Sequence, residues 1–286
     1  MKIIKYFIQF IIINIFLIIF KILGYKLASD LGSFLGKKLG PQFRSKKLIL
    51  NNLSKLNSQI NESEKNRIMK GMWSNYGRIL SEYVFIKNFR NSDLDEYLTT
   101  EGENILQKII ENKKPVIFIS GHFNNFELMA MQIEKANVKL ATIYRPLNNI
   151  FMNIIMENIR KKYICKNQIK KGIPGVREML QFFKNGHSIA LMIDQRVSQG
   201  IKVDFFGHSC LTTTIPAQLI KKFECDVIPV YIERIKRYHF RTVFGQPLSF
   251  DGDDSVESIT EDLNKILEKM IIKNPDQWIW SHNRWK

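Results

Sequence analysis

Hydrophobic residues are distributed along the chain in three ways, and each predicts a different kind of structure. Residues 6–20 form an uncharged run that is dense in isoleucine and phenylalanine. Residues 61–86 place their apolar side chains at helical spacing, and after about residue 98 short apolar runs alternate with amphipathic segments. The three patterns are typical of a membrane-associated helix, an amphipathic helix and an α/β domain, in that order.

The uncharged run from Tyr6 to Phe20 is preceded by two lysines and followed by Lys21. As a helix it would extend roughly 22 Å, short of the ~30 Å hydrocarbon core of a bilayer. Including residues 22–25, with the Lys21 side chain reaching the interface, brings it near the ~20 residues that span a membrane. We therefore expect a membrane anchor over residues 1–26. A signal peptide and an interfacial helix are the alternatives, although no small-x-small cleavage site follows closely.

The remainder, residues 27–286, shows no repeat, linker or clean boundary, and we expect one domain whose residues 27–98 form a helical, membrane-proximal part. Glycine and proline predict breaks in its first stretch, at Gly36, Gly40 and Pro41. A long helix is expected over residues 61–86, capped by Asn61 or Ser63. Basic residues concentrated after the anchor favour a cytoplasmic location for the domain that follows; they are Lys26, Lys37, Lys38, Arg44, Lys46 and Lys47.

The alternation that follows predicts the fold class. Strands are expected at residues 115–120, 140–144, 188–193 and 227–232, with a final hairpin partner near 240–244. Helices are expected at residues 103–111, 123–135, 149–162, 175–184, 213–223 and 255–272. This order is typical of an α/β domain with a mixed, mostly parallel central sheet flanked by helices.

Composition limits the possible partners. The chain has 286 residues, 45% of them hydrophobic, which is sufficient for a sizeable core. Lys and Arg number 43 against 27 acidic residues, a net charge of +16, so an anionic partner is expected. We expect a membrane surface or an acidic substrate or protein and no nucleic acid, because no nucleic-acid-binding motif is present. The three cysteines are widely spaced, which is typical of a reducing compartment.

The first candidate for catalysis is His122, which follows the apolar run 116–119 and Ser120-Gly121, with Glu127 five residues later. A histidine at the carboxyl end of such a strand lies where open α/β sheets bind ligands. A carboxylate one helical turn into the next helix can fold back and hold one ring nitrogen, which fixes the tautomer and raises the basicity of the other. The pair therefore predicts a general base that activates a hydroxyl. Capping or surface roles are the ordinary alternative for both residues.

Further polar residues end the neighbouring predicted strands. Arg145, after the strand at 140–144, could bind a phosphate or carboxylate, or pair with any nearby acid. Arg160 could bind an anion or complement the end of its helix. Asp194 could orient Arg145, Arg160 or His122, bind substrate, or cap its loop. The aromatic loop 204–207 leads to Thr212–Thr214 before a helix, where the helix N-terminus could bind a phosphate or oxyanion, or the threonines could simply cap the helix. The other histidines match no metal motif, so no metal is expected.

Together these motifs resemble the HX4D/E signature of the lysophospholipid-acyltransferase-like superfamily and, more narrowly, the lipid A biosynthesis acyltransferases of the Kdo2-lipid IVA lauroyl/myristoyl type. The match is ordered and covers nearly the whole chain. Its parts are Gly40-Pro41 with Arg44, residues 51–53, Tyr76-Gly77-Arg78 with Glu82, residues 121–127, residues 144–146, Asp194-Gln195, residues 203–207 and residues 275–285. Within the motif, Asn124-Asn125-Phe126 stands where members often carry Gly-Asn-Trp, so only Asn125 matches.

The resemblance implies transfer of an acyl chain to a hydroxyl of an anionic lipid A precursor at the inner membrane. The donor would be a thioester of acyl carrier protein or of coenzyme A, and no cofactor or metal would be needed. It implies His122 as general base, oriented by Glu127, with Arg145, Arg160, Asp194 and Asn125 binding substrate. A related acyltransferase acting on another glycolipid or a lysophospholipid, a metal-dependent hydrolase, and a non-catalytic membrane-surface protein are the alternatives. Acyl-chain length, the acceptor hydroxyl and the oligomeric state do not follow from the sequence.

Overall fold

A seven-stranded sheet forms the centre of the protein in the computed structural model, which describes residues 2–57 and 59–286. The strand order is β1-β9-β8-β2-β5-β3-β4. All neighbours run parallel except β8 and β9, which form an antiparallel hairpin. The strands are β1 (Leu98–Glu101), β2 (Ile117–Ser120), β3 (Leu140–Tyr144), β4 (Asn167–Lys170), β5 (Ser188–Met192), β8 (Val227–Lys236) and β9 (His239–Phe244).

The predicted fold class is confirmed: the sheet is mostly parallel and helices flank it. All five predicted strands are present, and the last of them, β9, is the expected hairpin partner. The edge strands β1 and β4 were not predicted. Neither was a separate two-stranded sheet of β6 (Ile201–Phe205) and β7 (His208–Thr212). These strands are short and only partly buried, so they lack a continuous apolar run.

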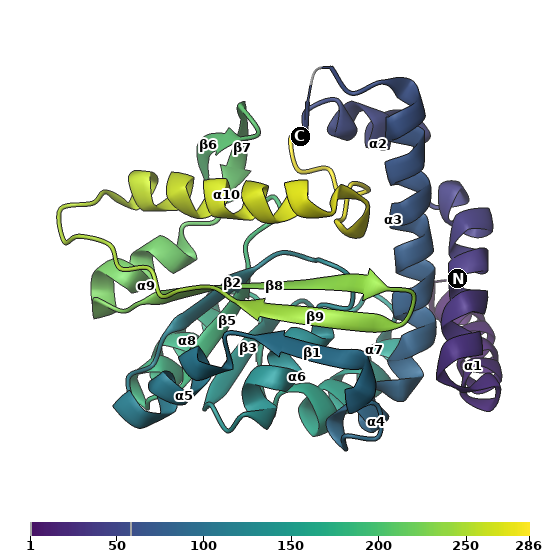
Figure 1. Ribbon diagram of the computed structural model, residues 1–286, viewed down its shortest axis with the longest axis horizontal. Helices are drawn as coiled ribbons and strands as arrows, with labels where there is room; N and C mark the ends of the chain where they lie inside the picture. Colours follow the sequence, from purple (N-terminus) through teal and green to yellow (C-terminus); the bar gives the residue numbers. More distant parts are fainter. Residues whose placement is uncertain (1, 58) are drawn as a thin grey trace.

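Helices cover both faces of the sheet, with α10 above it and α5 and α6 below it in Figure 1. The upright helix α3 stands across the end of the sheet toward which β8 points (Figure 1). The helices after residue 100 are α5 (Glu103–Asn112), α6 (Glu127–Lys135), α7 (Ile150–Ile159), α8 (Ile173–Lys184), α9 (Ile215–Phe223) and α10 (Val256–Lys273). Before it come α1 (Lys2–Leu39), α2 (Lys46–Leu53), α3 (Glu62–Glu82) and α4 (Ile86–Arg90).

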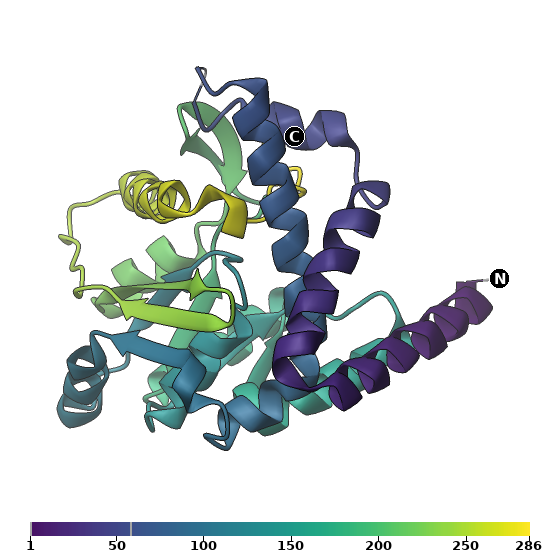
Figure 2. The same cartoon turned by 45° about the vertical axis from the view of Figure 1, so that its right-hand side comes forward.

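The N-terminal helix α1 bends at Gly24, whose φ of 75° lies in the left-handed region that favours glycine. Before the bend the helix leads away from the body of the molecule toward the N-terminus (Figure 2). Most of its large apolar side chains are exposed there, for example Ile8 and Ile15 at 52% and 53%. Among the described residues, α1 with its 3₁₀ extension (Lys2–Gln42) is the helix whose length and composition would allow it to cross a membrane. The predicted anchor lies within it, apart from Met1, which is outside the described residues.

After the bend, α1 packs closely against α3. A Cβ atom on Gly77 would lie 1.9 Å from the carbonyl oxygen of Gly32, and one on Gly36 would lie 2.1 Å from that of Trp73. The predicted break at Gly36 is wrong, because α1 continues through this residue. The missing side chain instead allows two helix backbones to touch. The predicted break at Gly40-Pro41 is confirmed by the 3₁₀ turn Gly40–Gln42. The predicted N-cap of α3 is also confirmed, because the Asn61 side chain accepts a hydrogen bond from Glu64 N.

Candidate active site

Three adjacent parallel strands end next to one another and carry the candidate residues on the loops that follow. His122 follows β2, Asp194 follows β5 and Arg145 follows β3, and these strands are neighbours in the order β2-β5-β3. The carboxyl ends of parallel strands form one edge of a sheet, which is where α/β folds bind ligands. The predicted position of the three residues at this edge is confirmed.

The imidazole of His122 is held by Asp194, not by Glu127. Its Nδ1 lies 2.7 Å from Asp194 Oδ1, and its backbone N–H donates to Asp194 Oδ2 over 2.7 Å. The indole Nε1–H of Trp278 donates to the same Oδ2 over 2.9 Å. An ionised carboxylate only accepts hydrogen bonds, so Nδ1 carries the proton and Nε2 is left basic. The expected Glu127 hydrogen bond is thus corrected: a carboxylate 72 residues further along the chain takes this position.

The surroundings raise the pKa of His122. Burial of the ring opposes protonation, but the negative charge and hydrogen bond of Asp194, followed by the charge of Glu127, outweigh it. Burial likewise opposes ionisation of Asp194, yet the pKa of this carboxyl group is lowered by His122 and by the Trp278 hydrogen bond. Asp194 is fully buried, while the His122 side chain is 23% exposed. The arrangement is therefore a buried carboxylate that supports a histidine open on one side.

Glu127 is paired with Arg160 instead. The Nε and Nη2 atoms of Arg160 both donate to Glu127 Oε1, at 2.9 Å and 2.5 Å. Burial of the guanidinium would lower the pKa of Arg160, but the charge and hydrogen bonds of Glu127 outweigh it, so this pKa is raised. The predicted helix began at Phe123, but α6 begins at Glu127 itself, so residues 123–126 form a loop. Glu127 is consequently the first residue of α6 and does not lie one turn into the helix. At this end of a helix the dipole stabilises a negative charge.

The loop between His122 and Glu127 is held from outside by a polar cluster. Asn124 adopts a left-handed conformation, φ 42°, which glycine and asparagine accept more readily than other residues. Its carboxamide donates to Gln277 and accepts from Arg234 Nη2 at 3.2 Å. Asn125 is fully buried and donates to Glu82 over 3.4 Å. The expectation that Asn125 binds substrate is therefore corrected: it is buried in the loop's support and does not line the cavity.

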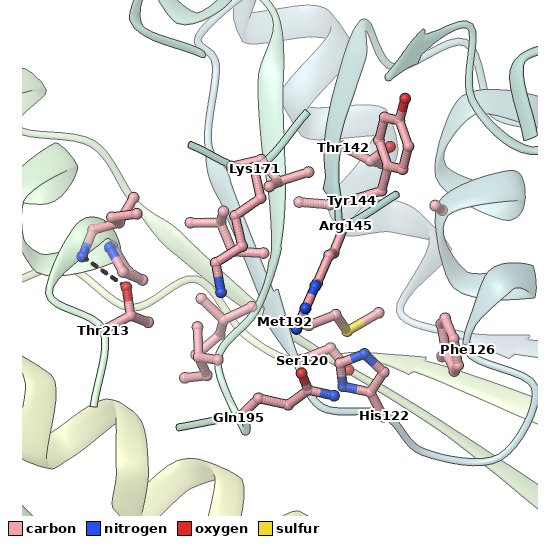
Figure 3. A pocket seen from close by; sticks show the side chains of 18 of the residues that line it. Ser120, His122, Phe126, Thr142, Tyr144, Arg145, Lys171, Met192, Gln195 and Thr213 are labelled. Atoms are coloured by element: carbon pink, nitrogen blue, oxygen red, sulfur yellow. Dashed lines mark hydrogen bonds between the residues drawn. The ribbon is translucent and has the colours of Figure 1, made fainter. Parts of the chain in front are cut away.

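A cavity of about 980 Å³ opens at the same edge of the sheet. Its walls include His122, Glu127 and both predicted arginines, Arg145 and Arg160. Asp194 does not line it, because its carboxylate is enclosed behind the histidine; the prediction that Asp194 contacts substrate is corrected in the same way. Figure 3 shows Arg145 reaching from the end of β3 toward His122, with Gln195 beside the imidazole and Lys171 entering from another wall.

The wall of this cavity combines two kinds of side chain. Basic side chains that are exposed or half-buried are Arg145, Lys171 and Arg196. Buried apolar side chains are Phe118, Met129, Ile133 and Ile164. Within the described residues Arg145 forms no ion pair, whereas Arg160 is committed to Glu127. The cavity can therefore receive a molecule that has both a negatively charged part and a hydrocarbon part.

Several residues of the site were not predicted from the sequence. Trp278, the second residue that bonds Asp194, lies in the matched stretch 275–285 without a predicted role, and the sequence does not single out Lys171 or Arg196. Their roles depend on distant segments meeting, so no local spacing reveals them. By contrast, Thr213 and Thr214 belong to the segment that the sequence singled out before a helix, and both line the cavity. Within residues 2–57 and 59–286, no group of three or more His, Cys, Asp or Glu side chains is placed to hold a metal ion.

Comparison with known proteins places the whole chain in a family. The sequence matches the profile of the bacterial lipid A biosynthesis acyltransferases over residues 1–286. The chain belongs to this family.

Individual relatives are distant. Lipid A biosynthesis acyltransferase 2 of Shigella flexneri is 23% identical over 184 residues, which cover 63% of this chain and 58% of the relative. The lipid A biosynthesis palmitoleoyltransferase of Escherichia coli (strain K12) is 22% identical, with 85% of this chain and 79% of the relative aligned. The myristoyltransferase of the same strain is 22% identical, with 85% and 75% aligned. The predicted resemblance is confirmed at the level of the family, while relatives of equal identity are named for different acyl chains.

Proposed function

We propose that the protein transfers a fatty acyl chain from an acyl carrier protein thioester to a hydroxyl group of a lipid A precursor of the Kdo2-lipid IVA type. The observation that carries this proposal is His122: its Nδ1 is bound to the buried Asp194, and its ring lines a cavity with basic and apolar walls. Membership of the lipid A acyltransferase family supports the class of reaction and of acceptor.

His122 is the general base of the proposed reaction. Its Nε2 removes the proton of the acceptor hydroxyl while the oxygen attacks the thioester carbonyl carbon. When the tetrahedral intermediate collapses, the carbon–sulfur bond breaks and the imidazolium returns the proton to the departing thiolate. The products are an ester and a free thiol. Asp194 fixes the tautomer and stabilises the imidazolium, and such positioned acid–base groups typically contribute about 10²–10⁴-fold.

Glu127 supports the same step through its charge. It lines the cavity beside His122, and its negative charge favours the protonated ring that forms in the transition state. Arg160 holds this carboxylate through two hydrogen bonds to one oxygen, which fixes its position. Arg145 is the side chain that we assign to the oxyanion, because it reaches toward His122 and forms no ion pair in the described part of the chain (Figure 3).

The cavity fits the two substrates of this reaction. Phosphates of the acceptor and the acidic carrier protein would meet Arg145, Lys171 and Arg196, and the net charge of +16 would attract both. The acyl chain would lie against the buried apolar wall formed by Phe118, Met129 and Ile133. With α1 inserted as an anchor in the inner membrane, we propose that the catalytic domain faces the cytoplasm, where acyl thioesters are made.

Lipid mass spectrometry tests the proposal. Membranes containing the wild type are compared with membranes containing His122→Ala, Glu127→Ala or the exposed control His208→Ala, at equal protein levels. The wild type and His208→Ala should add one acyl chain to the lipid A precursor, and the mass added gives the chain length. His122→Ala and Glu127→Ala should lose that product. Unchanged acylation in His122→Ala would overturn the mechanism, and acylation of another glycolipid only would overturn the acceptor.

Purified wild-type protein offered acyl carrier protein thioester or coenzyme A thioester distinguishes the donors. We expect turnover with the carrier protein thioester, because its acidic surface matches the basic wall of the cavity. Equal turnover with both thioesters would remove the carrier protein from the proposal while leaving the acyl transfer intact.

A further inference from the structure

Helix α7 exposes large apolar side chains, with Ile150 52% and Ile154 62% exposed. Two of its polar side chains are bonded within the protein: Asn153 donates to Glu157, and Glu157 accepts from the Tyr144 hydroxyl over 2.6 Å. The third, Asn158, is exposed at the far end of the helix. A surface helix normally presents a mainly polar face to water. The exposed isoleucines therefore predict that this face of α7 meets an apolar phase.

The same helix runs along the exposed, apolar half of α1. Phe151 packs edge-on against Phe7 at 5.5 Å and contacts Phe10 at 5.7 Å. Asn149 donates to the Tyr6 carbonyl oxygen over 2.8 Å, so it links the start of α7 to this part of α1. Further along, Asn14 Nδ2 lies 3.9 Å from the sulfur of Met152. The contacts extend over residues 6–14 of α1, roughly 12 Å along its axis.

These contacts determine where α7 must be when α1 enters a membrane. Residues 6–14 belong to the apolar run expected to insert, so a helix packed beside them enters with them. The alternative, α1 standing free of the domain, is not what the structure shows (Figure 2). Exposed Lys161 and Lys162 follow the apolar turns of α7, at the level where anionic headgroups would bind them.

We propose that α7 is a membrane-inserted helix, and that its Ile150–Ile154 face and the first half of α1 form one apolar surface that binds an anionic lipid bilayer. The cavity wall is joined directly to this surface. Arg145 and Leu147, which precede α7, and Arg160, which follows it, all line the cavity. Insertion of α7 therefore holds the cavity beside the headgroup layer, where a lipid acceptor can enter without leaving the membrane. This second part rests on the proposed acyltransferase function.

Fluorescence measurements on the full chain in phosphatidylglycerol-containing vesicles test the surface. An NBD label is placed at Ile154→Cys or at the control Ile110→Cys, in a Cys225→Ser background because the other two cysteines are buried. Ile110 is 41% exposed and lies on α5, far from the N-terminal half of α1 in both views (Figures 1 and 2). Doxyl-labelled lipids should quench the label at 154 several-fold more strongly than the label at 110.

Equal quenching at the two positions would overturn the proposal. So would a label at 154 that is shielded from water yet insensitive to doxyl lipids, because that result would indicate a second copy of the chain on this face. Neither quenching measurement requires acyl transfer. If the proposed acyltransferase activity were wrong, the measurements would still show whether α7 inserts into the membrane.

Activity tests the link between the surface and the cavity. Ile154→Glu should lower acylation of a vesicle-embedded acceptor about tenfold, equivalent to about 1.4 kcal/mol, and leave acylation of a detergent-solubilised acceptor unchanged. Ile110→Glu should change neither, and Ile154→Leu should behave as the wild type. If Ile154→Glu acylated the vesicle-embedded acceptor at the wild-type rate, α7 would not present the lipid to the cavity.

Discussion

Asp194 is the carboxylate that most strongly favours protonation of His122, and this gives a prediction for Asp194→Asn. An amide of the same shape keeps the packing against Trp278 but removes the negative charge that raises the pKa of His122. Its N–H group can also donate a hydrogen bond to Nδ1 and so stabilise the wrong tautomer. We expect kcat to fall by about 10²–10⁴-fold, comparable to the contribution of general-base catalysis.

The pH dependence distinguishes this role from a structural one. The base must be neutral, so activity rises as pH passes upward through the pKa of His122. Because Asp194 raises that pKa, the wild type should reach half-maximal kcat/KM above about pH 6.5, the ordinary histidine value. In Asp194→Asn the residual activity should reach half-maximum at lower pH. Asp253→Asn, an exposed control, should leave the profile unchanged. A profile of Asp194→Asn identical to the wild type would contradict this account.

The sequence was sufficient to predict His122 at the edge of the sheet, but it gave Asp194 only as one of several alternatives for the residue that orients it. A carboxylate five residues away suggested a local pair, because spacing along the chain is the only distance that a sequence provides. The structure brings Asp194 from β5, which neighbours β2 only because the strand order is not the chain order. Glu127 then pairs with Arg160, which the sequence also marked, but as an anion site.

The strands that the sequence predicts are more deeply buried than the edge strands that it misses. β2 is buried at all four positions, and its apolar run stood out. β1 and β4 obtain their order from hydrogen bonds to β9 and β3 and carry polar residues, so nothing local indicated them. The start of α6 was placed four residues early because residues 123–126 are held as a loop by distant side chains such as Gln277.

The close crossing of α1 and α3 predicts that Gly77→Ala destabilises the protein. The new methyl group would meet the Gly32 carbonyl oxygen at 1.9 Å, so the helices must separate. Overpacking of this kind typically costs about 1–3 kcal/mol. The free energy of unfolding in detergent measures the effect. Gly252→Ala is the matched control, because a Cβ atom there has no neighbour within 4 Å. Equal stability of the two variants would show that the crossing is looser than described.

A buried ion pair joins the N-terminal helices to the loop that carries the motif. Arg234 on β8 bonds both oxygens of Glu82, at 2.8 Å and 2.9 Å, and Glu82 is fully buried. Ser29 of α1 donates to the same carboxylate, and Asn125 of the loop donates to it from the other side. Arg234→Ala would leave this charge unpaired, which typically costs about 3–5 kcal/mol.

Thermal unfolding and activity together test that link. Arg234→Ala should lower the unfolding temperature and also reduce kcat, because Asn124 loses a partner and the loop beside His122 loosens. Arg237→Ala removes an exposed ion pair with Asp30 and serves as control, with an expected effect of about 0–1 kcal/mol. If Arg234→Ala were no more harmful than Arg237→Ala, the cluster would not connect the helices to the site.

The charge of the whole molecule gives a prediction about salt. Attraction between the basic wall of the cavity and an anionic acceptor or carrier protein is screened as ionic strength rises, since the Debye length falls from about 10 Å at 0.1 M to about 3 Å at 1 M. The hydrogen bond between His122 and buried Asp194 is shielded from that screening. Added salt should therefore raise KM several-fold while kcat changes little.

Two lysine variants test this attraction. Lys171→Gln should raise KM at low salt and weaken the salt dependence of KM, because this ammonium group lines the cavity. Lys184→Gln, exposed at the end of α8, should do neither. A fall in kcat with constant KM would instead mean that salt disturbs the chemical step and not the binding of substrate. The charges that matter would then lie beside His122 and not on the basic wall of the cavity.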